Sequence, residues 1–246
     1  IHLDAEINEL KEKLGAMWEL VSTQLDKTLT AMNNFDKDLA LEIQENEKRV
    51  NAYELNIDKE CEDFIALRQP VATDLRFALS TLKINTNLER IADIASGIAE
   101  FISDIDQSVN PEIIHLLQAE KMLAISIEMV KDLREAYQYE NTHLARTIFQ
   151  RDKLLDQIND QASHRALECL DKFVDQRRQT LHVLSIVRKI ERIGDQSKNI
   201  AEEIIFYLDA KVIKHAKKIK ELDKEGGEHV GIFINDIKNH LAFRTN

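Results

Sequence analysis

The sequence predicts an all-α protein made of two tandem three-helix bundles related by internal duplication. Its 246 residues include six glycines and two prolines, which leaves few places for turns. Apolar residues recur at the 3.6-residue helical period over long stretches. At ten of the 21 positions from 82 to 102, the same residue recurs 102 positions later. A repeat this long indicates duplicated domains rather than a short-period solenoid.

The six expected helices are each close to thirty residues long. Asn33 and Asn34 mark the first break, and Pro70 marks the second because it biases Gln69 away from the helical region. Asn110 followed by Pro111 is a strong helix start. The expected helices span residues 3–32, 38–68, 71–105, 111–137, 142–174 and 177–209. The predicted units are a first bundle at 1–108, a second at 109–210 and a tail at 211–246.

The tail differs in composition from the bundles. Lysines crowd between Lys211 and Lys220, and two glycines follow at 226 and 227. Positive charge near a helix C-terminus is the simplest interpretation of these lysines. We expect a short amphipathic helix near the end of the tail, and its role stays open.

Composition excludes several classes of protein. The formal net charge of −11 argues against a nucleic-acid-binding surface. Cys61 and Cys169 are far apart and lack the spacing of a zinc knuckle, as expected for isolated thiols in a reducing cytoplasm. The sequence shows no long apolar run, signal-peptide pattern, phosphate-binding glycine loop or nucleophile elbow. We therefore expect a soluble cytoplasmic protein that is not an enzyme, with no catalytic residues.

The repeated stretch places an acidic pair on the outward face of a helix in each half. Glu89 and Asp93 form the first pair, and Glu191 and Asp195 form the second. A solvated charged face is the simplest interpretation of one copy. Like charges four residues apart cost a few tenths of a kcal/mol, however, and the pair occurs in both halves. A cation shared between the two carboxylates would reverse that cost.

The preceding helix of each half also presents an acidic row. The rows are Glu47, Asn51, Glu54 and Asp58 in one half, and Asp152, Asp156, Asn159 and Asp160 in the other. An offset of 102 pairs Glu54 with Asp156, whereas an offset of 105 pairs Glu47 with Asp152. Both registers stay open, and both bring carboxylates together if the helices lie side by side.

These rows predict a metal site in each half. All-oxygen donor sets suit hard cations such as Mg²⁺, Ca²⁺, Mn²⁺ and ferric iron. The Glu-x-x-His motif of ferritin-like di-iron proteins is absent. We expect the second site to bind more tightly because of Asn51 in the first, and Asp74 is a weaker candidate. The predicted ligands are Glu54, Asp58, Glu89 and Asp93 in the first half and Asp152, Asp156, Asp160, Glu191 and Asp195 in the second.

The two Glu-Arg-Ile-x-Asp motifs, together with Gln69-Pro70-Val-Ala-Thr-Asp74-Leu75-Arg76, resemble the PhoU family of phosphate-specific transport system accessory proteins. The resemblance covers residues 10–210. It implies two three-helix bundles with multinuclear iron or zinc clusters on their E/D-x-x-x-D faces. It also implies negative regulation of phosphate uptake and of phosphate-starvation signalling. This chain departs from the family at Ala92, where the first motif usually has Gly.

The resemblance implies a cytoplasmic adaptor with two partners. These are the ATPase subunit of the phosphate ABC transporter (PstB) and the sensor histidine kinase (PhoR). Exposed apolar positions on long helices favour a homodimer. Two alternatives stay open: the cytosolic PhoU-like domain of a sodium–phosphate symporter, and a metal-binding scaffold without a signalling role. A metallohydrolase or oxidase is disfavoured because no base, nucleophile or His ligand is recognisable.

Overall fold

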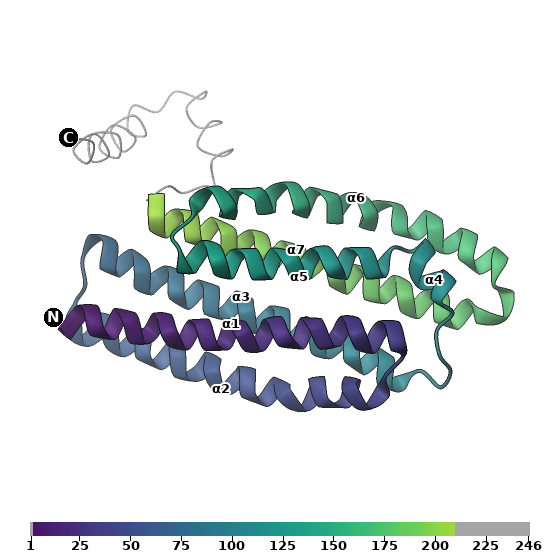
Figure 1. Ribbon diagram of the computed structural model, residues 1–246, viewed down its shortest axis with the longest axis horizontal. Coiled ribbons are helices and arrows are strands. Elements are labelled where there is room, and N and C mark those ends of the chain that lie inside the picture. Colours follow the sequence, from purple (N-terminus) through teal and green to yellow (C-terminus); the bar gives the residue numbers. More distant parts are fainter. Residues whose placement is uncertain (1, 210–246) are drawn as a thin grey trace, which may run out of the picture. The chain divides into compact units, whose positions relative to one another are not determined.

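The computed structural model describes residues 2–209, and all secondary structure within that span is helical (Figure 1). The first half contains α1 (His2–Asn34), α2 (Lys37–Arg68) and α3 (Ala72–Asp104). The second half contains α4 (Pro111–Leu116), α5 (Ala119–Gln138), α6 (Thr142–Lys172), the 3-10 turn η1 (Val174–Gln176) and α7 (Arg177–Asp209). The predicted all-α fold with two similar three-helix halves is confirmed.

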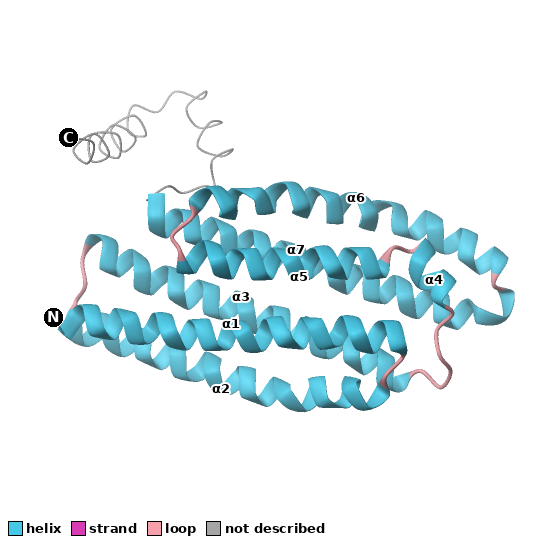
Figure 2. Cartoon of the chain, viewed as in Figure 1, coloured by secondary structure: helices cyan, strands magenta, loops and turns pink. Residues whose placement is uncertain are grey.

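Short turns separate the helices close to where the sequence predicts them (Figure 2). The side chain of Asp36 accepts a hydrogen bond from the Leu39 amide at 3.0 Å and caps α2. Asn110 and Asn141 cap α4 and α6 in the same way. Each cap satisfies an amide that has no partner inside its helix, which fixes where the helix begins.

The second half differs from the prediction of one helix over 111–137. α4 ends at Leu116, and α5 begins only after Gln118, whose φ of 57° lies in the left-handed region. Arg165 on α6 donates a hydrogen bond to the Leu116 carbonyl at 3.3 Å. With its amide oxygen turned toward α6, Gln118 also accepts from Arg165. This long-range partner stabilises a break that no glycine or proline marks.

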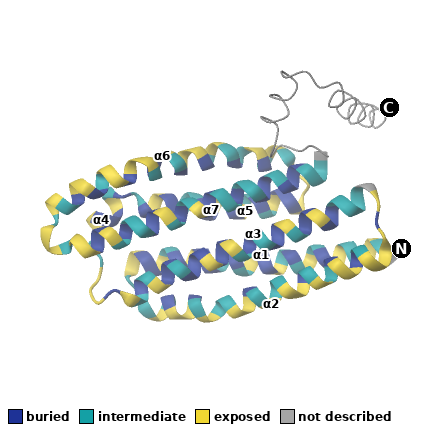
Figure 3. Ribbon diagram, turned by 180° about the vertical axis from the view of Figure 1, so that it is seen from behind, coloured by how far each residue is buried: buried dark blue, intermediate teal, exposed yellow. Residues whose placement is uncertain are grey.

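The two halves pack along two pairs of helices, α3 with α7 and α1 with α5, so that residues 2–209 form one compact unit. Trp18 on α1 is fully buried, and its indole N–H donates to the Val130 carbonyl of α5 at 3.0 Å. Buried residues follow the inner faces of the helices, and exposed residues lie on the outside (Figure 3). The contact between α3 and α7 is partly polar, because Asn199 donates to Asn87 at 3.3 Å.

The predicted boundary at residues 108 and 109 falls in the connection between α3 and α4. The predicted tail at 211–246, including its lysines and glycines, lies outside the described residues. Cys61 and Cys169 are free, buried thiols. No helix between residues 2 and 209 combines the length and the apolar character needed to cross a membrane.

Candidate metal centre

The first group of carboxylates lies where α2 packs against α3. Burial raises the pKa of Glu89 on α3 above its ordinary value of 4.5, and neighbouring negative charges raise it further. Those charges belong to Glu54, Asp93 and Glu47, in decreasing order of effect. We call these four residues the first acidic cluster: Glu47, Glu54, Glu89 and Asp93.

The second group lies where α6 packs against α7. Burial raises the pKa of Glu191 on α7, and three neighbouring carboxylates add to the effect. These are Asp195, Asp156 and Asp152, in decreasing order. Burial likewise raises the pKa of Asp156, with Asp152 as the strongest charged neighbour. The second acidic cluster is Asp152, Asp156, Glu191 and Asp195.

Shifts in this direction mean that each cluster is destabilised when fully ionised. The folded chain binds protons at Glu89 and Glu191 more tightly than the unfolded chain does. The contribution of these groups to folding stability therefore grows as pH falls through the raised pKa, and it levels off below the ordinary value. Groups of like charge that burial holds together are typical of functional sites.

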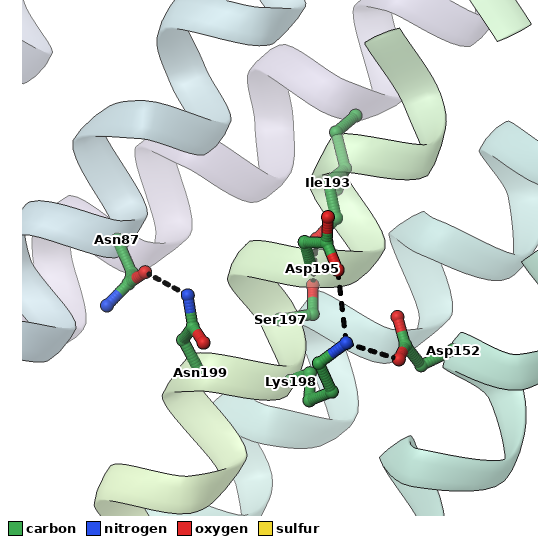
Figure 4. A network of polar contacts seen from close by, with 7 residues as sticks. All are labelled: Asn87, Asp152, Ile193, Asp195, Ser197, Lys198 and Asn199. Carbon is green, nitrogen blue, oxygen red and sulfur yellow. Dashed lines mark hydrogen bonds and ion pairs between the residues drawn. The ribbon is translucent and has the colours of Figure 1, made fainter. Parts of the chain in front are cut away.

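The second cluster contains a cation of its own. Lys198 on α7 donates from Nζ to Asp152 Oδ2 at 2.8 Å and to Asp195 Oδ1 at 3.0 Å (Figure 4). Burial alone would lower the pKa of Lys198, but its hydrogen bonds to the two carboxylates outweigh that effect and raise it. The ammonium group thus joins α6 to α7 through two acidic residues.

Asp152 is the most enclosed member of either cluster, with 3% of its surface exposed. Its Oδ1 atom is buried and has no hydrogen-bond partner. A Cβ placed on Gly194 would lie 3.1 Å from that oxygen and 2.7 Å from Cδ1 of Leu155. The missing side chain at Gly194 therefore lets α6 approach α7 closely at this level. Ala92 occupies the corresponding position of the first half.

The first cluster has a neutral group where the second has Lys198. The corresponding residue, 102 positions earlier, is Ser96, and its hydroxyl donates to Glu47 Oε2 at 2.8 Å. Ser96 thus contacts Glu47 as Lys198 contacts Asp152. The contacts therefore support the offset of 105 between α2 and α6, which the sequence left open. In this register Asn51 corresponds to Asp156, and Glu54 corresponds to Asn159.

Seven of the nine predicted ligands are members of the two clusters. Asp58 and Asp160 lie one helical turn farther along α2 and α6, where their negative charges raise the pKa of Glu54 and of Asp156, respectively. One oxygen of Asp58 also accepts from the buried amide of Asn85 at 2.8 Å. Asp74 is fifteen residues before Glu89 on α3, about 22 Å along the helix axis.

Two functional candidates were not predicted from the sequence: Glu47 as a member of the first cluster and Lys198 as the internal cation of the second. Glu47 was visible in the acidic row of α2, but only the 105 register gives it a counterpart in Asp152. Lys198 stands one turn beyond Asp195 on the same face. Its second partner, Asp152, is distant in sequence, so the ion pair depends on how the helices pack.

The donor set of each cluster fits a hard cation, because every candidate ligand offers carboxylate oxygens and none offers nitrogen or sulfur. The raised pKa values of Glu89 and Glu191 agree with a need for positive charge. As placed, no three His, Cys, Asp or Glu side chains within residues 2–209 converge closely enough to hold one metal ion. Side-chain rotation on the fixed helices would be required for them to share an ion.

Comparison with known proteins gives the family. The PhoU domain model matches residues 14–102 and 119–204, once in each half. The chain is 32% identical over 222 residues to the phosphate-specific transport system accessory protein PhoU of Escherichia coli strain K12, covering 90% of both chains. Two crystal structures have the same fold. PhoU from Pseudomonas aeruginosa matches with a TM-score of 0.77 and 30% identity, covering 85% of this chain and 99% of that one. PhoU from Streptococcus pneumoniae matches with a TM-score of 0.76 and 26% identity, covering 86% of this chain and 99% of that one. The chain therefore belongs to the PhoU family.

Proposed function

We propose that this protein is a metal-binding cytoplasmic adaptor that negatively regulates phosphate uptake and phosphate-starvation signalling. The observation that supports it most is the pair of acidic clusters at corresponding places in the two halves of a PhoU-family chain. Its relatives are phosphate-specific transport system accessory proteins, and we propose the same role for this chain.

The residues proposed to hold metal are the members of the two acidic clusters, with Asp58 and Asp160 at their margins. The proposed cofactor is a multinuclear iron or zinc cluster, with Mg²⁺, Mn²⁺ or Ca²⁺ as further candidates. Bound metal would supply positive charge that neutralises the carboxylates and ties adjacent helices together. The carboxylates would bind the metal, and the rigid helices that carry them would set the distances between the ligands.

The proposed partners are the ATPase subunit of the phosphate ABC transporter (PstB) and the sensor histidine kinase (PhoR). An adaptor shifts a partner's conformational equilibrium only by binding one state more tightly than another. We propose that docking uses surfaces other than the acidic clusters, and that the adaptor forms a homodimer. Light scattering of the purified chain, which gives its molar mass in solution, tests the dimer.

Gene deletion tests the regulatory role. Cells lacking the gene should take up phosphate faster and express starvation genes in high phosphate, and the wild-type gene should restore repression. Complementation with the double variant Glu89→Gln/Asp93→Asn then shows whether the first cluster matters. A matched control is Glu45→Gln/Glu62→Gln, which removes two exposed acids of α2. Unchanged uptake and expression after deletion, with no transporter or kinase recovered by pull-down, would contradict the proposed regulation.

A further inference from the structure

We infer that Lys198 takes the place of a metal ion in the second acidic cluster, so that metal binding by this chain is confined to the first. The inference rests on the proposed metal-binding function and narrows the ligand set proposed above, from both acidic clusters to the first alone. It reverses the expectation from sequence that the second site binds more tightly.

The position of the ammonium group is the first observation. Lys198 Nζ lies 2.8 Å from Asp152 Oδ2 and 3.0 Å from Asp195 Oδ1, within hydrogen-bonding reach of oxygens from both helices. It therefore holds a positive charge between the two rows of carboxylates, which is the role proposed for a metal (Figure 4). A metal ion that used these two oxygens would have to displace the lysine.

The enclosure of Asp152 is the second observation. Oδ2 is held by Lys198, and the buried Oδ1 faces the backbone at Gly194, where even an added Cβ would come within 3.1 Å. With these neighbours in place, Asp152 presents no open side to an incoming ion. A divalent ion bound about 4 Å from the ammonium group would also be repelled strongly enough to lose about tenfold or more in affinity.

The first half lacks this arrangement. At the position corresponding to Lys198, Ser96 donates to Glu47 through a neutral hydroxyl, which leaves the charge of Glu47 in place. Glu47 is also half-buried, in contrast to Asp152. Arg90 lowers the pKa of Glu89 and so partly offsets the negative charge of the first cluster, but it does so from an exposed position on the helix. The first cluster therefore keeps both its negative charge and its access to solvent.

The duplication supplies the test, because each half contains the control residue for the other. Wild type, Lys198→Ser, Ser96→Lys and Ser96→Ala are purified and dialysed against Mn²⁺, and separately against Zn²⁺. Bound metal per chain is measured by elemental analysis, and the dissociation constant by titration calorimetry. Circular dichroism and thermal unfolding establish that each variant is folded.

We expect Lys198→Ser to bind about twice as much metal as wild type, and Ser96→Lys to weaken binding about tenfold or more. Ser96→Ala removes the hydroxyl without adding charge and should keep wild-type binding. Lys198→Gln, which removes the charge but keeps a donor for Asp152, replaces Lys198→Ser if that variant does not fold. It should show the same gain.

Two results would overturn the inference in distinguishable ways. If folded Lys198→Ser and Lys198→Gln bind no more metal than wild type while wild type does bind, the lysine does not exclude metal, although the metal-binding function stands. If no folded variant, including wild type, binds either metal, the proposed metal-binding function fails together with the inference.

Discussion

Substitution of Gly194 by alanine tests whether α6 and α7 approach as closely as the structure shows. The added Cβ would lie 2.7 Å from Leu155 Cδ1 and 3.1 Å from Asp152 Oδ1, both shorter than an ordinary van der Waals contact. Leu155 is fully buried, so it can yield only by disturbing the core. Overpacking of this kind costs about 1–3 kcal/mol.

Gly15 provides the matched control. It lies inside α1, and a Cβ built there meets nothing within 4 Å. Replacing glycine by alanine inside a helix contributes about 1 kcal/mol through helix propensity, and this gain is common to both positions. Gly15→Ala should therefore stabilise the chain by about 1 kcal/mol, which corresponds to a rise of about 2–4 °C in Tm. Gly194→Ala should be less stable than Gly15→Ala by the overpacking cost of about 1–3 kcal/mol.

Urea unfolding followed by circular dichroism measures both variants on one scale. Their unfolding midpoints should separate while the denaturant slopes stay equal, because the two substitutions expose similar surface on unfolding. Equal stabilisation by Gly15→Ala and Gly194→Ala would refute the close approach at Gly194. Such a result would also mean that Asp152 is not enclosed at Gly194.

Three further predictions follow from the described residues. Because the pKa values of Glu89 and Glu191 are raised, the double variant Glu89→Gln/Glu191→Gln should gain stability at pH 7, and its stability should depend less on pH as pH falls toward the ordinary value of 4.5. An unchanged pH dependence in thermal unfolding would contradict the sign of the shifts. Trp18→Ala should lose about 3–5 kcal/mol in chemical unfolding, since Trp18 is fully buried where α1 meets α5, and a loss below about 1 kcal/mol would contradict that packing. Asn141→Ala should cost about 1 kcal/mol by removing the α6 cap, whereas Asn141→Asp should cost less in the same assay.

Local chemistry was enough to predict most of the fold. Pro70 and the Asn110-Pro111 pair mark helix boundaries because their backbone preferences act within a few residues. The break at Gln118 could not be predicted in this way. Its stabilising partner, Arg165, is on another helix, and the local sequence has no glycine or proline to indicate a turn.

The residues of the candidate site could be predicted from the sequence, but which residues face each other across neighbouring helices could not. Helical periodicity alone puts Glu191, Asp195 and Lys198 on one face of α7. Which residues of α6 oppose them depends on the register between helices, and two offsets were compatible with the sequence. Only the contacts of Ser96 with Glu47 and of Lys198 with Asp152 distinguish the offsets. The sequence therefore could not show that one cluster contains its own cation.

The most direct test of the account is the metal content of two matched double variants, Glu89→Gln/Asp93→Asn in the first cluster and Glu191→Gln/Asp195→Asn in the second. Both remove two negative charges at corresponding positions. After dialysis against Mn²⁺, the first variant should retain only background metal by elemental analysis, and the second should bind as much as wild type. Full binding by the first variant together with loss in the second would contradict the assignment of metal to the first half.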